Sequence, residues 1–276
     1  TMWDVAGFPQ QNTDWEYVER TDGTIKVLQY LGSSTNVIIS KINNKEVSEV
    51  YNGCFQYKSN IISVTIPNSV INIGESVFNG CTSLENLTIP FVGHSSTSTG
   101  FQGVFGYIFG YTTQTTKSGD SSSSSSFTTL TTGSVENAVC SWTDKTYSYR
   151  VKTGGSLLFP KYTTYYGLCS YWYYIPSSLK NVTVTGGNIN TAAFCRVPNI
   201  KVTLNGVATI GTYAFYNGTP TSITISESVT KIEENAFSGC SGLTSINIPS
   251  SVTTISASSS SDSPFYNWNS SAGVFF

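Results

Sequence analysis

The chain has 276 residues, of which only 11% are charged, and its formal net charge is −2 at pH 7. This composition excludes nucleic acid and anionic membrane surfaces as expected partners, because both are bound by basic patches that the sequence does not supply. No run of residues is long and apolar enough to span a bilayer, so no transmembrane segment is predicted. Because charged residues are few, the solubility of the chain must come from Ser, Thr, Asn and Tyr.

Residues 1–36 are predicted to form a lead-in followed by a β-hairpin. Trp15-Glu-Tyr-Val-Glu-Arg precedes an Asp22-Gly23 dipeptide, and Thr24-Ile-Lys-Val-Leu follows it. Asp-Gly between two alternating segments is a strong hairpin signal. Such a hairpin can cover the apolar end of the element that follows, which would otherwise be an exposed edge. We therefore expect an N-terminal cap.

A repeated pattern fills residues 37–90 and 179–255. Each copy has a strand with two apolar residues around a polar one, then an apolar pair three residues apart, then a small residue followed by Phe. Within each stretch this Phe recurs every 21 to 23 residues, at Phe55 and Phe78 and again at Phe194, Phe215 and Phe237. A period of 22–23 residues predicts a solenoid, whose turns bury their apolar sides against one another.

The period is that of leucine-rich repeats, and Leu84-Glu-Asn-Leu87-Thr-Ile89 satisfies their opening pattern L-x-x-L-x-L. The residues after each strand do not predict a helix, because Thr, Val, Ile and Ser dominate them. The sequence therefore predicts a mainly β fold, a leucine-rich-repeat solenoid of 22–23-residue turns.

The repeat is interrupted between its two stretches, in residues 91–178. This segment contains the Ser run Ser121–Ser126, which predicts a mobile loop, and a high density of aromatic residues. We expect the aromatic parts to form an inserted β subdomain. After residue 255 the pattern decays, and residues 256–276 are expected to form a C-terminal cap.

The six cysteines and the single histidine, His94, give little support to a metal site, since no Cys-x-x-Cys pair occurs. Cys81 and Cys240 occupy the same position of the repeat, several turns apart, so they are predicted to be free and buried. Cys140 and Cys169 lie in the inserted segment. The sequence leaves open whether they form a disulfide.

Catalytic residues are not predicted, and neither is a cofactor. His94 beside Ser95 and Ser96 lacks the geometry of a triad, and it is interpreted as a surface-loop residue. Glu233 and Glu234 are sequence neighbours, so they point apart, unlike a glycosidase pair that faces across a cleft. Both are interpreted as solvated.

Two surfaces are candidate binding sites. The first is the polar side of the strands, at Thr65, Thr88, Thr183, Thr203 and Thr224, although Thr also favours strands for its own sake. The second is the inserted segment, with Trp142, Tyr147, Tyr149, Tyr171 and Trp172, because Tyr and Trp are enriched at interfaces and in sugar-stacking sites. The alternative is that these aromatics form the core of a small subdomain that has few aliphatic residues.

The units Ile66–Cys81 and Ser226–Cys240 resemble the BspA-type leucine-rich repeats of bacterial cell-surface proteins. The resemblance covers about residues 37–90 and 179–255, and Val104–Gly110 also resembles features seen around such repeats in gut bacteria. It implies an exported protein at the cell surface or outside the cell. Some members of this family act as adhesins for host proteins or other bacteria, and the family has no shared catalytic residues to assign here.

The sequence thus favours a non-enzymatic, adhesin-like interaction protein whose partner is a protein or glycan on a host or bacterial surface. A carbohydrate-binding module that uses the inserted aromatics is the alternative, and a hydrolase is a weaker one. The sequence does not indicate an oligomeric state.

Overall fold

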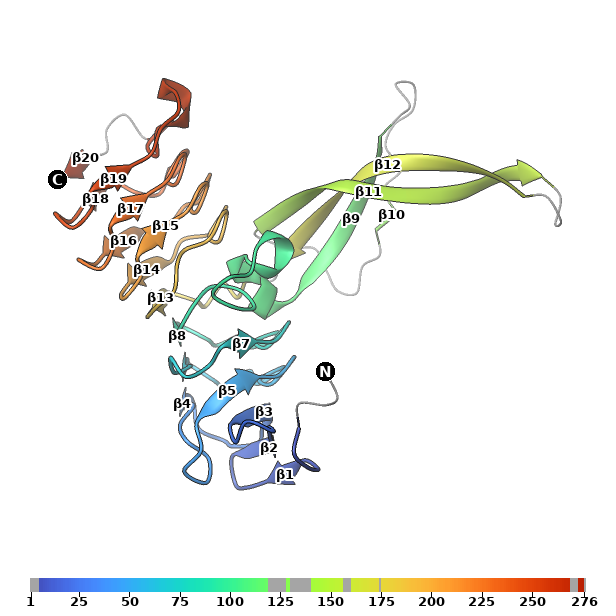
Figure 1. Cartoon of the computed structure of the whole chain (residues 1–276), viewed down its shortest axis with the longest axis vertical. Helices are drawn as coiled ribbons and strands as arrows, with labels where there is room; N and C mark the ends of the chain where they lie inside the picture. The colour runs from blue at the N-terminus through green and yellow to red at the C-terminus, as the bar shows by residue number, and fades with distance from the viewer. Residues whose placement is uncertain are drawn as a thin grey trace.

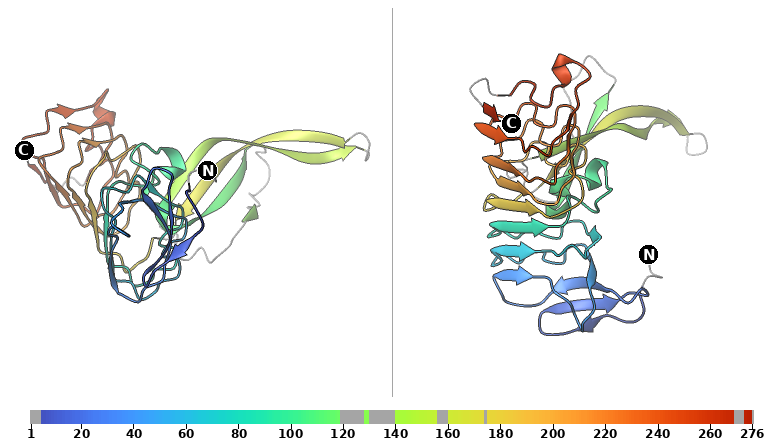
Figure 2. Two further views of the ribbon diagram at one scale, coloured as in Figure 1. Left: turned by 60° about the horizontal axis from the view of Figure 1, so that its bottom comes forward. Right: turned by 60° about the vertical axis from the view of Figure 1, so that its left-hand side comes forward.

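The computed structural model describes residues 5–118, 128–129, 140–155, 160–173, 175–268 and 273–275. Side chains are described for these residues except Phe101, those in 111–172, Val274 and Phe275. The Ser run Ser121–Ser126, predicted to be mobile, lies outside the described residues. The predicted mainly β solenoid is confirmed, and its turns are stacked one above another (Figure 2).

The first strands of successive turns form one parallel sheet of six strands. These strands are β4 (Asn36–Ile38), β6 (Ser63–Thr65), β8 (Asn86–Ile89), β13 (Asn181–Val184), β14 (Lys201–Leu204) and β16 (Ser222–Ile225). They pair in register, so that Val64, Leu87 and Val182 stack inside the solenoid. Beyond β16, strand β18 (Ser245–Asn247) pairs in parallel with β20 (Gly273–Phe275).

The other side of the turns carries shorter parallel strands in two groups. The first group, β5 (Val47–Val50) and β7 (Asn72–Ile73), extends a sheet formed by β1 (Gln10–Gln11), β2 (Trp15–Glu19) and β3 (Ile25–Tyr30). In that sheet β2 and β3 are antiparallel, and β3 runs parallel to β5. The second group is β15 (Thr209–Ile210), β17 (Lys231–Ile232) and β19 (Thr254–Ile255).

His94 fills the place of a strand residue between these two groups. The Ile73 N–H donates to the His94 carbonyl (2.8 Å), His94 Nδ1 lies 2.9 Å from the Ile73 carbonyl oxygen, and the His94 ring packs edge-on against Tyr107. His94 thus lies in a loop, as predicted, but these contacts hold it against the neighbouring turn. His94 is half-buried, because the solenoid continues through this turn although the sequence pattern lapses.

An aromatic column runs through the solenoid. Successive ring centroids lie 4.9 to 5.9 Å apart, from Trp15 and Tyr30 through Phe55, Phe78, Phe109, Phe105, Phe194, Phe215, Phe237 and Phe265 to Trp268. Phe215 stacks on Phe237, with centroids 5.4 Å apart and ring planes inclined by 10°. We call each repeat Phe of this column a rung.

The backbone around five of the rungs follows one pattern that the sequence analysis did not anticipate. Around Phe55, Phe78, Phe194, Phe215 and Phe237, the residues two before and two after the Phe have positive φ; around Phe215 they are Tyr213 (57°) and Asn217 (51°). With this backbone conformation the rung residue donates its N–H to a backbone carbonyl of the next turn, as Phe215 does to the Ala236 carbonyl (2.7 Å). Left-handed backbone favours Gly and Asn, which explains Gly80 and Gly239 at these positions.

Two rungs come from a single short element at the interruption. The 3₁₀ helix η2 (Phe105–Phe109) follows η1 (Gly100–Gln102), and it binds the turns on both sides. Phe78 donates its N–H to the Ile108 carbonyl (2.8 Å), and Phe105 donates to the Ala193 carbonyl (2.7 Å). In Figure 1 the C-terminal turns lean away from the side that carries η2.

A sheet projects from the solenoid at this point (Figure 1), in the strand order β10-β9-β12-β11. Its strands are β9 (Tyr111–Ser118), β10 (Thr128–Thr129), β11 (Cys140–Gly155) and β12 (Pro160–Tyr173). We call the long antiparallel pair β11 and β12 the hairpin. The predicted range 91–178 stays a prediction as a domain, but Phe91, Phe109 and Tyr173 inside it are buried in the solenoid's core.

The last 3₁₀ helix, η4 (Ser260–Asp262), precedes the final rung, Phe265. The prediction that Cys81 and Cys240 are free and buried is confirmed. Each thiol donates to the carbonyl of a rung in a neighbouring turn, Cys81 to Phe55 (3.1 Å) and Cys240 to Phe215 (2.9 Å).

The hairpin register bears on the pair of cysteines that the sequence left open. Cys140 lies opposite Tyr173 and Cys169 lies opposite Asp144, four positions along the strands. That offset separates their backbones by about 13 Å, whereas a disulfide needs Cα atoms within about 7 Å. This register disfavours a bond between them.

Alkylation tests the burial of the thiols. Burial raises the pKa of Cys81 and of Cys240 to about 12, and the thiolate is the reactive form. We expect both to resist iodoacetamide at pH 8 in the native chain and to react quickly in guanidinium, as measured by mass spectrometry. Rapid modification of the native thiols would contradict this burial.

The same burial makes the free energy of unfolding depend on pH. The thiols lose their protons at lower pH in the unfolded chain than in the folded one, because folding raises their pKa. The free energy of unfolding should therefore be constant up to about pH 9 and decline as pH rises towards 12, by up to about 1.4 kcal/mol per pH unit and thiol.

Candidate functional site

A straight strip of threonines lies on the outer face of the six-stranded sheet. Its members are direct partners in the parallel register: Thr65, Thr88, Thr183, Thr203 and Thr224. Strand pairing spaces them about 4.8 Å apart, and each is at least partly exposed. We call this set the threonine strip. It presents a regular array of hydroxyl and methyl groups suited to contact with an extended partner.

A second polar column runs beside the strip, and several of its groups are already paired. Ser63 Oγ donates to Asn36 Oδ1 and Asn181 Nδ2 donates to Asn86 Oδ1, both at 2.7 Å. These bonds link successive turns across the surface. They stiffen the face that carries the threonine strip but leave fewer free groups for a ligand.

The predicted aromatic residues of the insertion lie on the hairpin. Trp142 is the direct cross-strand partner of Tyr171, Tyr149 of Tyr165, Tyr147 of Gly167 and Trp172 of Ser141. Their side chains are outside those that the structure describes. Whether they form a core or a binding surface therefore stays open.

The structure does not bring the two predicted surfaces together. In Figures 1 and 2 the hairpin extends away from the solenoid, on the side opposite the strands that carry the threonine strip. Strand β12 contacts η2 and β11 contacts η1, so the hairpin is attached on the rung side. A partner bound along the hairpin would leave the strip free.

The acidic neighbours Glu233 and Glu234 have separate structural partners. Glu233 accepts hydrogen bonds from Lys231 Nζ (2.8 Å) and from the Thr212 hydroxyl (3.1 Å), and the Lys231 bond is the main reason that its pKa is lowered. Glu234 accepts from the Ser258 hydroxyl. Both glutamates were predicted to be solvated, but Glu233 is held by these hydrogen bonds to neighbouring side chains.

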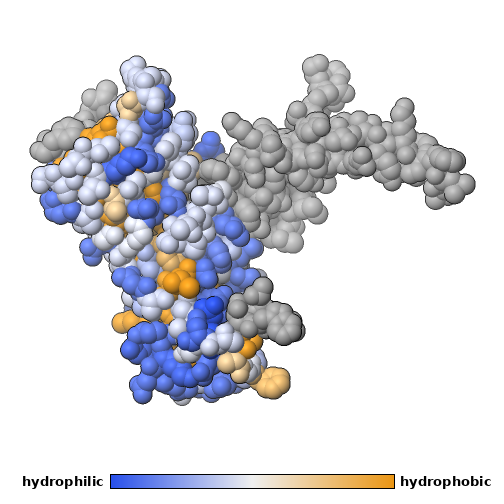
Figure 3. Space-filling model, viewed as in Figure 1, coloured by the Kyte–Doolittle hydropathy of each residue, from blue (hydrophilic) through white to orange (hydrophobic). Residues whose placement is uncertain are grey.

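Within the described ranges, no group of three or more His, Cys, Asp or Glu side chains is placed to hold a metal ion. The same part of the chain contains no helix that is long and apolar enough to cross a membrane. Figure 3 shows one face whose visible surface is largely hydrophilic, with small separate apolar patches.

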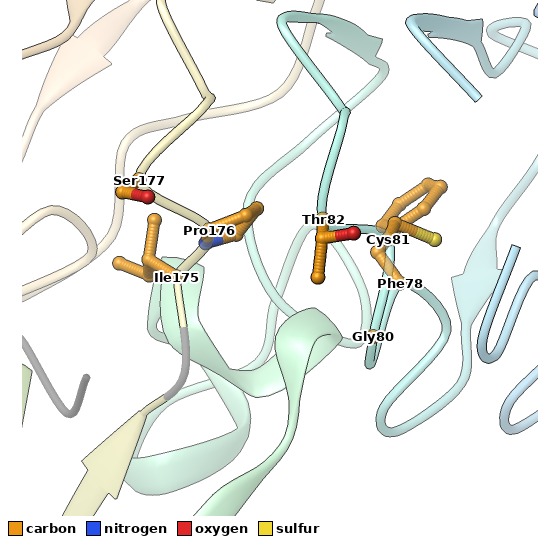
Figure 4. A pocket seen from close by; sticks show the side chains of 7 residues that line it. All are labelled: Phe78, Gly80, Cys81, Thr82, Ile175, Pro176 and Ser177. Atoms are coloured by element: carbon orange, nitrogen blue, oxygen red, sulfur yellow. The ribbon is translucent and has the colours of Figure 1, made fainter. Parts of the chain in front are cut away.

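Two pockets flank the place where the chain re-enters the solenoid. The smaller measures about 180 Å³ and is bounded by Cys81 and Thr82 on one side and Ile175 and Pro176 on the other (Figure 4). This volume is below that of typical ligand sites. The other, of about 320 Å³, is lined by Asn68, whose amide oxygen already accepts from the Thr185 hydroxyl (2.6 Å).

A third pocket, of about 310 Å³, lies in the C-terminal turns and was missed by the sequence analysis. We call it the tyrosine pocket, and its main lining residues are Tyr213, Tyr216, Asn235, Ser238, Asp262 and Tyr266. The signal that could have found it is the recurrence of Tyr and Asn one or two residues from a rung. The recurrence can be interpreted only once it is known which residues around each rung have positive φ.

Comparison with known proteins agrees with the repeat pattern. A sequence model described as "BspA type Leucine rich repeat region" matches residues 18–147 and 168–273, in six copies. A search of curated proteins finds no match. Because the family model covers most of the sequence, its match does not depend on one motif.

Solved structures that match include a leucine-rich repeat protein of T. pallidum, with 15% identity and a TM-score of 0.29 over 90% of this chain and 64% of that one. A leucine-rich cell surface protein of Faecalibacterium prausnitzii A2-165 has 17% identity and a TM-score of 0.31 over 98% of this chain and 95% of that one. A leucine-rich repeat protein of Bacteroides ovatus ATCC 8483 has 17% identity and a TM-score of 0.42 over 98% of this chain and 53% of that one. The chain thus spans less than two thirds of the first and third of these proteins. From the family model, the chain belongs to the BspA type leucine rich repeat family.

Proposed function

We propose that the chain is a non-enzymatic, adhesin-like interaction protein of the bacterial surface or its surroundings, and that it binds host or bacterial proteins. Membership of the BspA type family supports an interaction role. The observation that carries the proposal is the projecting hairpin, which stands clear of the solenoid on long paired strands (Figure 1).

The solenoid is suited to act as a rigid support. Neighbouring turns stabilise one another, so a long excursion from one turn is tolerated without being needed for the fold. Recognition usually resides in segments held out by such scaffolds. The residues proposed to make contact are Trp142, Tyr147, Tyr149, Tyr171 and Trp172, since aromatic side chains gain contact area at low entropy cost.

The threonine strip is the alternative contact surface, should binding not depend on the hairpin. Its five hydroxyls are fixed in register by the sheet, so a partner would lose little entropy by ordering them. Because the strip and the hairpin lie on opposite sides, the two surfaces can be tested separately.

Excision of the hairpin tests the first surface. Residues 112–172 would be replaced by a short Gly/Ser linker, with Gly110, Tyr111 and Tyr173 retained because Phe109 and Tyr173 belong to the core. The linker can be short, since Tyr111 and Tyr173 are direct strand partners. We expect circular dichroism still to report a folded β protein. Binding to immobilised host matrix proteins and to intact bacterial cells, measured by surface plasmon resonance and adherence assays, should disappear.

The matched control is a Thr183→Lys, Thr203→Lys double variant, which alters the strip without touching the hairpin. Its binding should equal that of the unaltered chain. Binding that survives hairpin excision but is lost in the double variant would move the site to the threonine strip. A chain that fails to fold after excision would show that the hairpin aromatics contribute to the core.

A further inference from the structure

We propose that the tyrosine pocket binds a neutral saccharide. Its volume of about 310 Å³ lies at the lower end of the range for small-ligand sites. It is formed by the turns of the rungs Phe215, Phe237 and Phe265, outside both the hairpin and the threonine strip. The proposal therefore does not depend on the function assigned to those surfaces.

The pocket has two tyrosine walls with a small residue between them. Tyr216, Ser238 and Tyr266 each follow a rung directly, in three successive turns. Because stacked turns are spaced by about 4.8 Å, the two tyrosines are attached about 10 Å apart. Tyr213 adds a third ring, edge-on to Tyr216 with centroids 5.3 Å apart. A slot of this shape accepts a flat, ring-shaped ligand whose C–H faces lie against aromatic surfaces.

Polar groups at the floor of the slot lack a protein partner. Asn235 is 5% exposed and Ser238 is 2% exposed, and both line the pocket. In the described part of the chain no hydrogen bond engages either side chain, although Asn235 donates its backbone N–H to the Asp262 carbonyl (3.0 Å). Buried polar side chains nearly always have a partner.

These two side chains are nevertheless not sealed in the interior. Across the described residues, Arg20 Nε is the one side-chain nitrogen or oxygen that is both fully enclosed and without a hydrogen-bond partner. The polar atoms of Asn235 and Ser238 therefore open on the pocket. A ligand hydroxyl placed there would supply the hydrogen bonds that the protein does not.

The backbone around the pocket is held in a conformation that has a cost. Tyr213, Asn217, Asn235 and Asn267 all have positive φ, between 51° and 57°. Asn adopts this left-handed region of backbone conformation readily, whereas a bulky residue such as Tyr rarely does. Tyr213 is also 41% exposed, so burial of its ring does not explain its presence. The same φ occurs around rungs elsewhere in the solenoid, so this backbone is part of the repeat and places the Tyr213 ring at the rim of the pocket.

The charge of the lining selects the ligand. Asp262 lines the pocket, and no Lys or Arg is among the described residues that do. An anionic sugar or a phosphate would therefore meet a carboxylate without a balancing cation. Carboxylate and amide groups match the donors and acceptors of sugar hydroxyls. One or two neutral pyranose rings fit these features.

The test is calorimetric titration of the full chain with glucose, galactose, mannose, N-acetylglucosamine and their disaccharides, with sialic acid as the anionic comparison. We expect at least one neutral sugar to bind and sialic acid not to bind. Tyr266→Ala and Tyr213→Ala should each weaken that binding at least tenfold. Tyr57→Ala is the matched control, because Tyr57 is 73% exposed and has a φ of 60° in an N-terminal turn.

Hydrogen exchange of the unaltered chain with the bound sugar gives a second measurement that does not rely on a variant. Exchange should slow in residues 212–218 and 260–267 and be unchanged at residues 53–58. The proposal is overturned if no neutral sugar binds up to about 10 mM, or if Tyr57→Ala weakens binding as much as Tyr266→Ala. Binding should persist after hairpin excision, which separates this site from the proposed adhesin function.

Discussion

Replacing Phe215 by Ala should lower the free energy of unfolding by about 3 to 5 kcal/mol, the cost typical of truncating a buried Phe. Phe215 is fully buried, and its ring is stacked between those of Phe194 and Phe237 at 5.1 and 5.4 Å. Removing it takes away contacts on both faces. Neighbouring rungs are fixed by hydrogen bonds between turns, so they cannot close the gap. Guanidinium unfolding followed by circular dichroism measures the loss.

Phe8→Ala is the matched control for this prediction. It removes the same atoms from a side chain that is 91% exposed, so its effect should stay within about 0.5 kcal/mol. Similar losses for the two variants would show that the aromatic column does not hold the turns together.

Gly106→Ala should destabilise the chain by about 3 kcal/mol, at the upper end of overpacking costs. A Cβ atom at Gly106 would lie 2.0 Å from Cγ and 2.3 Å from Cβ of Tyr173. Tyr173 is fully buried and ends strand β12, so its ring and its backbone would both have to shift. We expect a lower unfolding midpoint and faster hydrogen exchange in η2 and at the base of the hairpin.

Gly7→Ala is the control here, because a Cβ atom at Gly7 would meet nothing within 4 Å. A second check uses the double variant Gly106→Ala, Tyr173→Gly, which removes both the ring and the Cβ atom of Tyr173. The Gly106 substitution should cost much less once the ring is gone, which gives a measurable coupling energy. Equal costs in both backgrounds would mean that the close approach to Tyr173 is not the cause.

The sequence predicts the solenoid well because each turn repeats the same buried positions. Val64, Leu87 and Ile223 identify the first sheet, and Phe78 and Phe215 identify the column, without any knowledge of the structure. Apolar periodicity is a local property, so it survives changes elsewhere in the turn.

The turn after β8 could not be predicted in the same way. Its rung is Phe109, which lies farther along the chain than the repeat allows, because η2 replaces the usual segment. His94 joins the neighbouring turn through backbone hydrogen bonds that any residue could make, so its side chain carries no signal of the repeat. The tyrosine pocket was missed for a related reason. Its members come from three turns, and only the stacking brings Tyr216 and Asp262 to one pocket.

The double rung of η2 has a consequence for how the molecule unfolds. In a repeat protein, cooperativity passes only between adjacent units, so one weak interface divides the chain into segments that melt independently. Phe109 contacts the N-terminal turns and Phe105 contacts the C-terminal turns, and both belong to the short 3₁₀ helix η2. The rungs on both sides are thereby coupled through the five residues of η2. We therefore expect the solenoid to unfold as a single cooperative unit even though a long segment projects from its middle.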